Sequence, residues 1–398
     1  MSLLRSARFP AVVLLVAAIA ALLIANSPLG ASVVALKDAY IGIPGVLEMS
    51  VGHWIQDGLL AVFFFMVAVE LQFELTNGEL NSARKALQPA IAAAGGVIVP
   101  IAIFLVFAAG SDSARGWPIP TATDIAFALG VLAVFGKGLP SGIRIFLLAL
   151  AILDDIVGIV FIAVLFTDGV NIAMLALAAI AVIVFGVLSR QLDSRARIPI
   201  VIALVIVGIA TWVLVYESGV HATIAGVALG LAMAQQPALR TRHVLEPWVN
   251  GVVLPLFAFS AALVIIPAIS PSQLAPAFWG VLIALPVGKI IGITLFGWIS
   301  LRIGNRGAAP HLSFLDLLAA GALGGIGFTV SLLLSELAFA ADPLLRDEAT
   351  LGVLGGSLIS LIVAGALVSQ RAHHYRRLAG SPDVDEVAPS TPAGGQLS

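Results

Sequence analysis

Long stretches of apolar residues alternate with short polar segments along most of the 398-residue chain. A helix that crosses a lipid bilayer needs about 20 mainly apolar residues. Twelve stretches come close to this length, of which the fourth and eighth are short, and we predict a membrane-spanning helix in each of them. The predicted spans lie near Phe9–Asn26, Ile55–Phe73, Pro89–Ala109, Pro118–Phe135, Ile143–Phe166, Val170–Leu188, Ile198–Tyr216, Gly219–Ala234, Trp248–Ile269, Pro276–Ile299, Phe314–Phe339 and Leu351–Ser369.

The composition indicates that these helices face lipid rather than a soluble core. Hydrophobic residues make up 60% of the chain and charged residues 11%, and the mean hydropathy is +1.09. A soluble protein of this size needs more charge on its surface, so we predict an all-α polytopic membrane protein. The net charge of -2 argues against nucleic-acid binding, which requires a basic surface. The absence of cysteine excludes disulfides and thiol chemistry, and we expect no cofactor.

Lysine and arginine are distributed unequally between the two sides of the predicted spans. Cytoplasmic loops carry an excess of these residues. Of the 20 in the chain, Lys37, Arg115 and Arg346 lie on one side, and Lys289 lies within a span. The other sixteen lie on the opposite side and are Arg5, Arg8, Arg84, Lys85, Lys137, Arg144, Arg190, Arg195, Arg197, Arg240, Arg242, Arg302, Arg306, Arg371, Arg376 and Arg377. We therefore predict a multi-pass protein of the cell inner membrane with both termini in the cytoplasm.

The loops are too short to form a soluble domain, so residues 1–378 are predicted to form one transmembrane domain. The longest loop, about Ser27–Trp54, has room for a small hairpin or a subunit contact. Residues 379–398 are rich in Pro, Gly, Ser and acids, and this tail is predicted to be disordered.

Four ionisable residues are predicted to lie deep in the hydrocarbon: Asp124, Asp154, Asp155 and Lys289. Charges at this depth are costly and mark functional sites by default. Asp154 and Asp155 lie roughly 17 Å from the start of their helix, at 1.5 Å per residue. Their short side chains cannot reach the membrane surface from there.

Adjacent residues on a helix point about 100° apart, so Asp154 and Asp155 cannot serve one small site equally. Lys289 is the only base predicted within the membrane, and it can pair with one of the two. The other acid can then share a hydrated cavity with Asp124. Two such carboxylates can hold protons or a small hard cation, which prefers oxygen ligands. If only the loaded site can change its exposure, competition between the cation and protons produces antiport.

Two of the predicted spans contain helix-breaking residues near their middle. Pro118 and Pro120 precede Asp124 in the fourth span. The eleventh span contains four closely spaced glycines, Gly321, Gly324, Gly325 and Gly327. Paired broken segments in two halves of a transporter indicate a binding site between inverted repeats, so we predict such repeats in spans three to five and ten to twelve, with two broken, crossing helices. The alternative is that the glycines only allow close helix packing.

The residues around these positions resemble the NhaA-type Na+/H+ antiporter family, over about residues 61–369. The TDIAFA, DD and GIGFT elements are specific together. The similar segments are TATDIAFALGVLA at Thr121–Ala133, ALAILDDIVG at Ala149–Gly158, SGVHATIAGV at Ser218–Val227, LPLFAF at Leu254–Phe259, GKIIGI at Gly288–Ile293 and GGIGFTVS at Gly324–Ser331. The broken-helix rule used above was itself drawn partly from this family.

The resemblance implies a non-enzymatic function, in the maintenance of internal pH and sodium. It implies electrogenic exchange of about two protons inward for each Na+ or Li+ outward, which a membrane potential drives at about 2.3 kcal/mol per net charge and 100 mV. It places Asp124 and Asp155 as the Na+ ligands, with Thr123 beside the ion path, and pairs Asp154 with Lys289. Which of Asp154, Asp155 and Lys289 carries each proton stays open. The resemblance also implies a possible homodimer, because relatives in the family form homodimers.

Some residues depart from the family pattern near the cytoplasmic side. Glu70, Glu74, His243 and Glu246 match parts of a cluster linked to pH regulation. Gln72 and Phe73 stand where the family often has a basic pair, and the segment Phe259–Val264 lacks the usual asparagine. His221 matches its motif, and we expect a structural role for it near the outer end of a span.

Three other functions were considered. An intramembrane aspartyl protease also places two acids on different helices, but its GxGD signature is absent and it leaves Lys289 unexplained. A sodium-coupled solute symporter of similar architecture needs a larger and more polar cavity than the sequence indicates. A passive cation channel does not require a gated site for which two ions compete.

Overall fold

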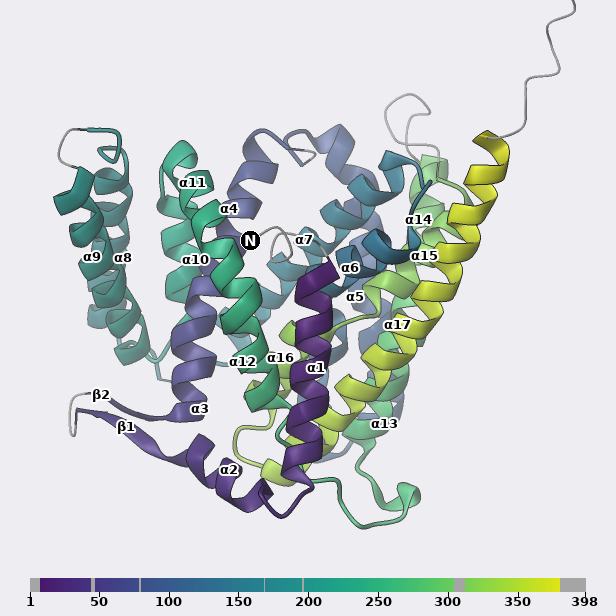
Figure 1. Ribbon diagram of the computed structural model, residues 1–398, viewed down its shortest axis with the longest axis horizontal. Helices are drawn as coiled ribbons and strands as arrows, with labels where there is room; N and C mark the ends of the chain where they lie inside the picture. Colours follow the sequence, from purple (N-terminus) through teal and green to yellow (C-terminus); the bar gives the residue numbers. More distant parts are fainter. Residues whose placement is uncertain are drawn as a thin grey trace, which may run out of the picture.

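The computed structural model describes residues 8–43, 47–78, 80–167, 169–194, 197–303 and 312–379. Long helices stand side by side, with α8 and α9 at one edge and α13, α14 and α17 toward the other (Figure 1). The helices are α1 Arg8–Ala25, α2 Gly30–Asp38, α3 Val51–His53, α4 Leu60–Thr76, α5 Ala83–Ala108, α6 Ile125–Phe135, α7 Ser141–Leu165, α8 Ile172–Ser189, α9 Arg197–Glu217, α10 Thr223–Ala232, α11 Gln235–Trp248, α12 Leu254–Ala261, α13 Pro276–Ile283, α14 Lys289–Ile303, α15 Phe314–Gly324, α16 Phe328–Ala338 and α17 Pro343–Ala379.

Several of these helices join into longer spans. Short π-helical turns at Trp54–Leu59, Val249–Val253 and Ala284–Gly288 connect α3 to α4, α11 to α12 and α13 to α14. Among the described residues, eight helices are then long and apolar enough to cross a membrane, and three further pairs are bent at a break. With the shorter apolar helix α10, each predicted span overlaps a helical segment. This confirms an all-α polytopic membrane protein.

The position of the ninth span was predicted wrongly. It was expected at Trp248–Ile269, but the continuous helical run covers Gln235–Ala261. The chain beyond Ala262 leaves the helix because the side chain of Asn26 satisfies its backbone groups. Asn26 donates to the carbonyl of Val264 at 2.9 Å and accepts from the amide of Ile266 at 2.9 Å.

The loop after α1 contains the small hairpin that its length allowed. Strand β1 (Tyr40–Ile43) pairs antiparallel with β2 (Leu47–Ser50), in a register that places Tyr40 opposite Ser50. Residues 44–46 lie outside the described part. The hairpin and α2 lie at the lower end of the view in Figure 1, opposite the end of α17. A subunit contact and a homodimer stay predictions.

The three basic residues assigned to the outer side gather at one place. Lys37, Arg115 and Arg346 line a common cavity of about 700 Å³. This agrees with their assignment to one side of the membrane. Three of the basic residues assigned to the cytoplasmic side lie outside the described residues, namely Arg5, Arg195 and Arg306. The tail that was predicted to be disordered, 379–398, also lies outside them, except for Ala379, which ends α17.

Helices α5 and α14 approach each other closely through two glycines. A Cβ on Gly95 would lie 2.4 Å from the carbonyl oxygen of Gly292, and one on Gly292 would lie 2.1 Å from that of Gly95. Any side chain at either position would therefore push the helices apart. This contact fixes α14, which carries Lys289, against the third predicted span.

The predicted inverted repeats are compatible with this architecture. Spans three to five correspond to α5, the broken helix that ends in α6, and α7. Spans ten to twelve correspond to the continuous helix α13–α14, the broken pair α15 and α16, and α17. Each group therefore has two continuous spans around a broken one. The symmetry between them stays a prediction.

Candidate ion-binding site

The fourth and eleventh spans are both broken, and the breaks meet. Residues 122–124 separate a 3-10 turn, Ile119–Thr121, from α6, and residues 325–327 separate α15 from α16. The halves bend by 45° and 48°. The amide of Asp124 donates to the carbonyl of Ile326 at 2.6 Å, which joins one break to the other. The predicted broken helices are confirmed.

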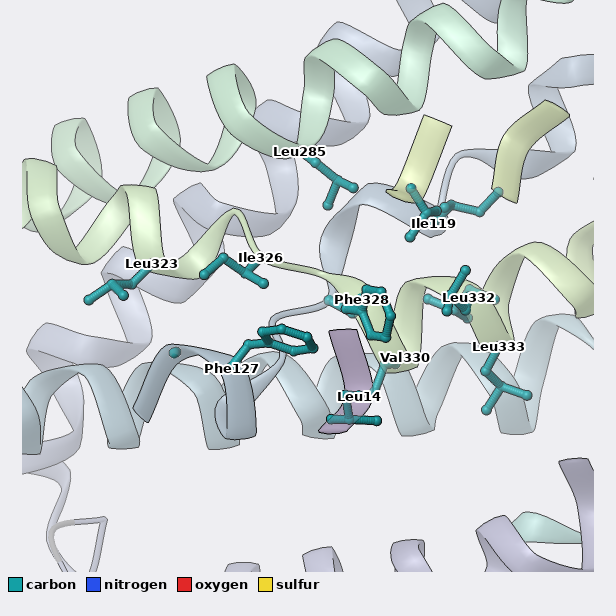
Figure 2. Packing of buried hydrophobic residues seen from close by; sticks show 14 of the residues in the cluster. Leu14, Ile119, Phe127, Leu285, Leu323, Ile326, Phe328, Val330, Leu332 and Leu333 are labelled. Carbon is teal, nitrogen blue, oxygen red and sulfur yellow. The ribbon is translucent and has the colours of Figure 1, made fainter. Parts of the chain in front are cut away.

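Aromatic packing and glycines hold the two breaks in contact. Figure 2 shows the rings of Phe127 and Phe328 beside each other, with centroids 4.9 Å apart. A Cβ on Gly325 would lie 2.8 Å from the carbonyl oxygen of Leu285, so the break passes directly against the backbone of the neighbouring helix. Gly321 instead sits inside α15 and packs on Ile290. The glycines of the eleventh span thus serve both the break and close helix packing.

Asp124 lies where the N-termini of two half-helices converge. Its Oδ1 accepts from the amide of Phe127 at 3.1 Å and thereby caps α6. Its Oδ2 accepts from the amide of Thr329 at 3.1 Å and from the hydroxyl of Thr329 at 2.7 Å, near the start of α16. Helix N-termini carry a partial positive charge, so they and these hydrogen bonds partly offset the cost of burying the charge of Asp124, of which only 3% of the surface is exposed.

Lys289 and Asp154 form a fully buried ion pair. The Nζ of Lys289 donates to Asp154 Oδ2 at 2.6 Å, and the side chains of both residues have no exposed surface. The ammonium also donates to the carbonyl of Thr121, at the C-terminal end of the 3-10 turn, where the partial charge is negative. Lys289 directly follows the π-helical turn that contains Pro286. Such turns occur frequently at functional sites because they redirect the side chains around them.

Thr123 connects this ion pair to the other broken helix. Its hydroxyl contacts Asp154 Oδ2 at 2.6 Å and the carbonyl of Gly324 at 2.8 Å. It also accepts from Lys289 at 3.2 Å. The resemblance implied that Thr123 lies beside the ion path. In the structure, Thr123 lies next to Asp154.

Asp155 is buried without a partner of opposite charge. Its exposed surface is 6%, and its Oδ1 has no hydrogen-bond partner within the described part of the chain. It interacts electrostatically with the acids Asp154, Asp124 and Glu70 and with Lys289. Oδ1 of Asp154 also has no hydrogen-bond partner among the described residues, but Oδ2 of Asp154 is bonded to Lys289. Asp155 makes no such ion pair within the described ranges, so it is the acid of the site whose charge is least compensated.

The donor set suits a cation only if backbone and hydroxyl oxygens take part. No group of three or more acidic or histidine side chains in the described ranges is arranged to hold a metal ion. Asp155 has an unpartnered carboxylate oxygen, and further oxygen ligands would have to come from Asp124, Thr123 or the unwound carbonyls of the two breaks. Hard monovalent and divalent cations accept such oxygen ligands.

Comparison with known proteins identifies the family. The family model described as Na+/H+ antiporter 1 matches residues 1–368. A Na(+)/H(+) antiporter NhaA 2 of Clavibacter michiganensis is 53% identical over 394 residues, which cover 97% of this chain and 96% of that protein. A Na(+)/H(+) antiporter NhaA of Tropheryma whipplei is 44% identical, with 96% and 98% covered, and one of Streptomyces avermitilis is 42% identical, with 98% and 85% covered.

The chain belongs to the NhaA family of Na+/H+ antiporters. The relatives are named as transporters, not enzymes, which removes the intramembrane protease from consideration. The resemblance deduced from the motifs is confirmed.

The residues that the NhaA resemblance linked to pH regulation lie together on α4 and α11. Glu70 accepts from Arg242 at 2.9 Å, and His243 lies 3.8 Å from Glu246 on the exposed side of α11. Glu74 is buried one turn after Glu70 on α4. Their regulatory role stays a prediction.

The departures from the NhaA pattern have structural partners. Gln72, at a position where the family often has a basic residue, donates to the carbonyls of Leu231 and Met233 at the end of α10. Arg242 supplies the cation for Glu70 from α11 instead of from α4. The sequence analysis counted Arg242 only as a loop charge and did not identify this pair.

His221 lies in the connection before α10, at the cavity that Lys37, Arg115 and Arg346 also line. Its Nδ1 is 3.6 Å from Asp57 Oδ1. Burial, with a smaller contribution from the charge of His53, lowers the pKa of His221 to about 4. The ring is therefore neutral near neutral pH, and the structural role that we expected for this histidine stays a prediction.

Two groups at the ion site were missed by the sequence analysis. Thr329 makes two hydrogen bonds to Asp124, and the carbonyl of Thr121 binds Lys289. Thr329 belongs to the GGIGFTVS segment, so its motif was recognised without its role. The carbonyl of Thr121 carries no signal in the sequence, because any residue supplies one.

Proposed function

We propose that this chain is an electrogenic antiporter of the inner membrane that exports Na+ or Li+ in exchange for about two protons, driven by the membrane potential. Asp155 and Asp124 bind the cation by alternating access, with both termini in the cytoplasm. Family membership and the names of the relatives support Na+/H+ exchange. The observation that carries the proposed mechanism is the buried carboxylate of Asp155, which has an unpartnered oxygen among three acids and one base.

The argument is one of charge balance. Lys289 compensates Asp154, and two half-helix N-termini compensate Asp124. An uncompensated buried charge costs several kcal/mol or more, about 3–5 when a buried partner is removed. Asp155 must therefore carry either a proton or a cation whenever the site is closed. Because the two occupants exclude each other, binding of Na+ releases a proton from Asp155. The second proton of the proposed exchange must then come from the Asp154–Lys289 pair.

The closed state of the site fits an alternating-access cycle. The four ionisable groups are at most 6% exposed. Neither large cavity, of about 930 and 700 Å³, is lined by Asp124, Asp154 or Asp155. A permanently open path would be a channel, whereas exchange requires that the site be closed between openings to the two sides.

The site also favours an antiporter over a sodium-coupled solute symporter. A symporter must hold an organic solute beside its ion, and small-molecule sites typically occupy about 300–1,000 Å³. The larger of the two cavities has a mostly apolar lining around Phe185 and Trp212 and is not lined by the acids.

Purified protein in liposomes tests the proposal. An imposed pH gradient, inside acidic, should be dissipated when Na+ or Li+ is added, and K+ should have less effect. A valinomycin clamp at different potentials should change the exchange rate, because exchange of about two protons for one Na+ moves about one net charge per cycle. An unchanged gradient after Na+ addition would contradict antiport, and a rate independent of potential would contradict the proposed stoichiometry.

A further inference from the structure

A second buried ionic cluster lies at the end of α15 that is remote from the ion site. Asp316 is 1% exposed, and both of its carboxylate oxygens are bonded. Oδ1 accepts from Arg371 Nε at 2.8 Å, and Oδ2 accepts from the hydroxyl of Tyr375 at 2.7 Å. Ser313 completes the cluster, since its amide donates to Asp316 Oδ2 at 2.9 Å and its hydroxyl accepts from the amide of Asp316.

This cluster does more than cap a helix. Ser313 and Asp316 alone form a capping box that satisfies the first turn of α15. Arg371 and Tyr375 come from α17, one turn apart on the same face. Arg371 also donates to Ser313 at 3.1 Å, and its guanidinium lies 4.9 Å from the centre of the Tyr375 ring. The first turn of α15 is thereby fixed to α17.

The opposite end of α15 forms part of the ion site. The carbonyl of Gly324 binds the hydroxyl of Thr123, which also contacts Asp154. Gly321 packs so closely on α14 that an added Cβ would lie 3.3 Å from the carbonyl oxygen of Lys289. Eight residues separate Asp316 from Gly324, which corresponds to about 12 Å of helix at 1.5 Å per residue. A displacement of the first turn along the helix axis would therefore reach Thr123 and Lys289.

We propose that Asp316, Arg371 and Tyr375 are positioning residues for cation binding, which fix α15 along its axis and so place the Gly324 carbonyl and Thr123 beside Asp154. The inference rests on the proposed Na+/H+ exchange at this site. It adds a second group of residues, outside the ion path, that sets the affinity for the cation.

A purely structural role makes a different prediction. A cluster that only stabilises the fold would reduce the amount of folded protein and the maximal rate, and would leave the Na+ concentration for half-maximal exchange unchanged. A positioning role changes that concentration, because the geometry of the site itself is altered. Mutations along such a coupled network typically change an equilibrium by about 0.5–2 kcal/mol.

The test compares Na+ titrations of exchange in liposomes, normalised to folded protein, for Asp316→Asn, Arg371→Lys and Tyr375→Phe. Asp316→Asn should raise the KM for Na+ by roughly two- to thirtyfold, which is the range that corresponds to coupling of this size. Arg371→Lys keeps the positive charge but loses the planar guanidinium group with its several N–H donors, so it should raise the KM for Na+ by an intermediate amount. Tyr375→Phe removes one hydroxyl, and should fold and raise KM by about twofold.

Asp193→Asn is the matched control. Asp193 pairs with Arg240 at 2.6 Å, but both side chains are about two-thirds exposed and lie away from α15. This variant should leave KM and the melting temperature unchanged. An unchanged KM in Tyr375→Phe and Arg371→Lys, with only fewer folded molecules, would overturn the inference while exchange by the wild type still stands. A wild type that shows no Na+-dependent exchange would overturn the proposed function and this inference together.

Discussion

The molecule contains two buried clusters of charged side chains whose hydrogen bonds are completed to different degrees. In the cluster of Asp316, Arg371 and Tyr375, one acid faces one base, and every carboxylate oxygen is bonded. In the ion site, three acids face Lys289, and Oδ1 of Asp155 has no partner among the described residues. A completed buried network fixes a structure. An incomplete one needs an additional charge, and in the proposed function that charge is the transported ion.

Asp155→Asn should have the largest effect on transport and should not destabilise the fold. The amide has the same shape and removes the uncompensated charge, so no proton or cation needs to be exchanged at this position. We expect loss of Na+-dependent dissipation of the pH gradient, with a melting temperature equal to or above that of the wild type. Wild-type exchange by this variant would contradict the assignment of Asp155.

Lys289→Ala should have the largest effect on stability. It leaves Asp154 as an uncompensated buried charge, and breaking a buried pair in this way costs about 3–5 kcal/mol. Thermal unfolding in detergent should show a clear fall in melting temperature, and exchange should shift in its pH dependence. The double variant Asp154→Asn with Lys289→Ala should recover part of the stability. If both measurements were unchanged in the single variant, the pair would not be needed.

Thr329→Val should weaken cation binding without abolishing exchange. It removes the hydroxyl bond to Asp124 and keeps the backbone bond from the same residue. A lost hydrogen bond to a charged group is worth about 1.5–3 kcal/mol, so the KM for Na+ should rise by tenfold or more. Thr350→Val is the control, because Thr350 is equally buried and pairs with Ser335 instead. Equal effects of the two variants would indicate a general packing defect.

Arg242→Gln should have the smallest effect of the four on stability. Its pair with Glu70 is partly exposed, at 31% and 25%, and such pairs contribute less than about 1 kcal/mol. Glu70 loses the cation that favours its ionised form, so the activity profile should move toward alkaline pH. Exchange measured from pH 6 to 9 checks this, and an unmoved profile would show that the Glu70–Arg242 pair takes no part in pH regulation.

The sequence predicted the membrane spans and the four buried ionisable residues because both signals are chemical. An apolar stretch must be a span, and an aspartate within it is costly wherever its neighbours lie. The breaks before Asp124 and at Gly325 were predictable for the same reason, since Pro and Gly weaken a helix locally.

Other features depend on long-range contacts that residue types do not reveal. The carbonyl of Thr121 reaches Lys289 only because one helix ends there, 168 positions away in the sequence. The ninth span ends early because Asn26, from the first predicted span, binds the chain at Val264. Arg371 was assigned only to the cytoplasmic side, because nothing in the sequence places it beside Asp316.

The number of protons released when Na+ binds is the most direct test of Asp155 as the exchanging group. Purified protein in weakly buffered detergent solution is mixed with NaCl, with choline chloride as the control, and a pH dye records the change. The account predicts proton release by the wild type and by Asp193→Asn, and none by Asp155→Asn. Equal release by Asp155→Asn and the wild type would contradict it.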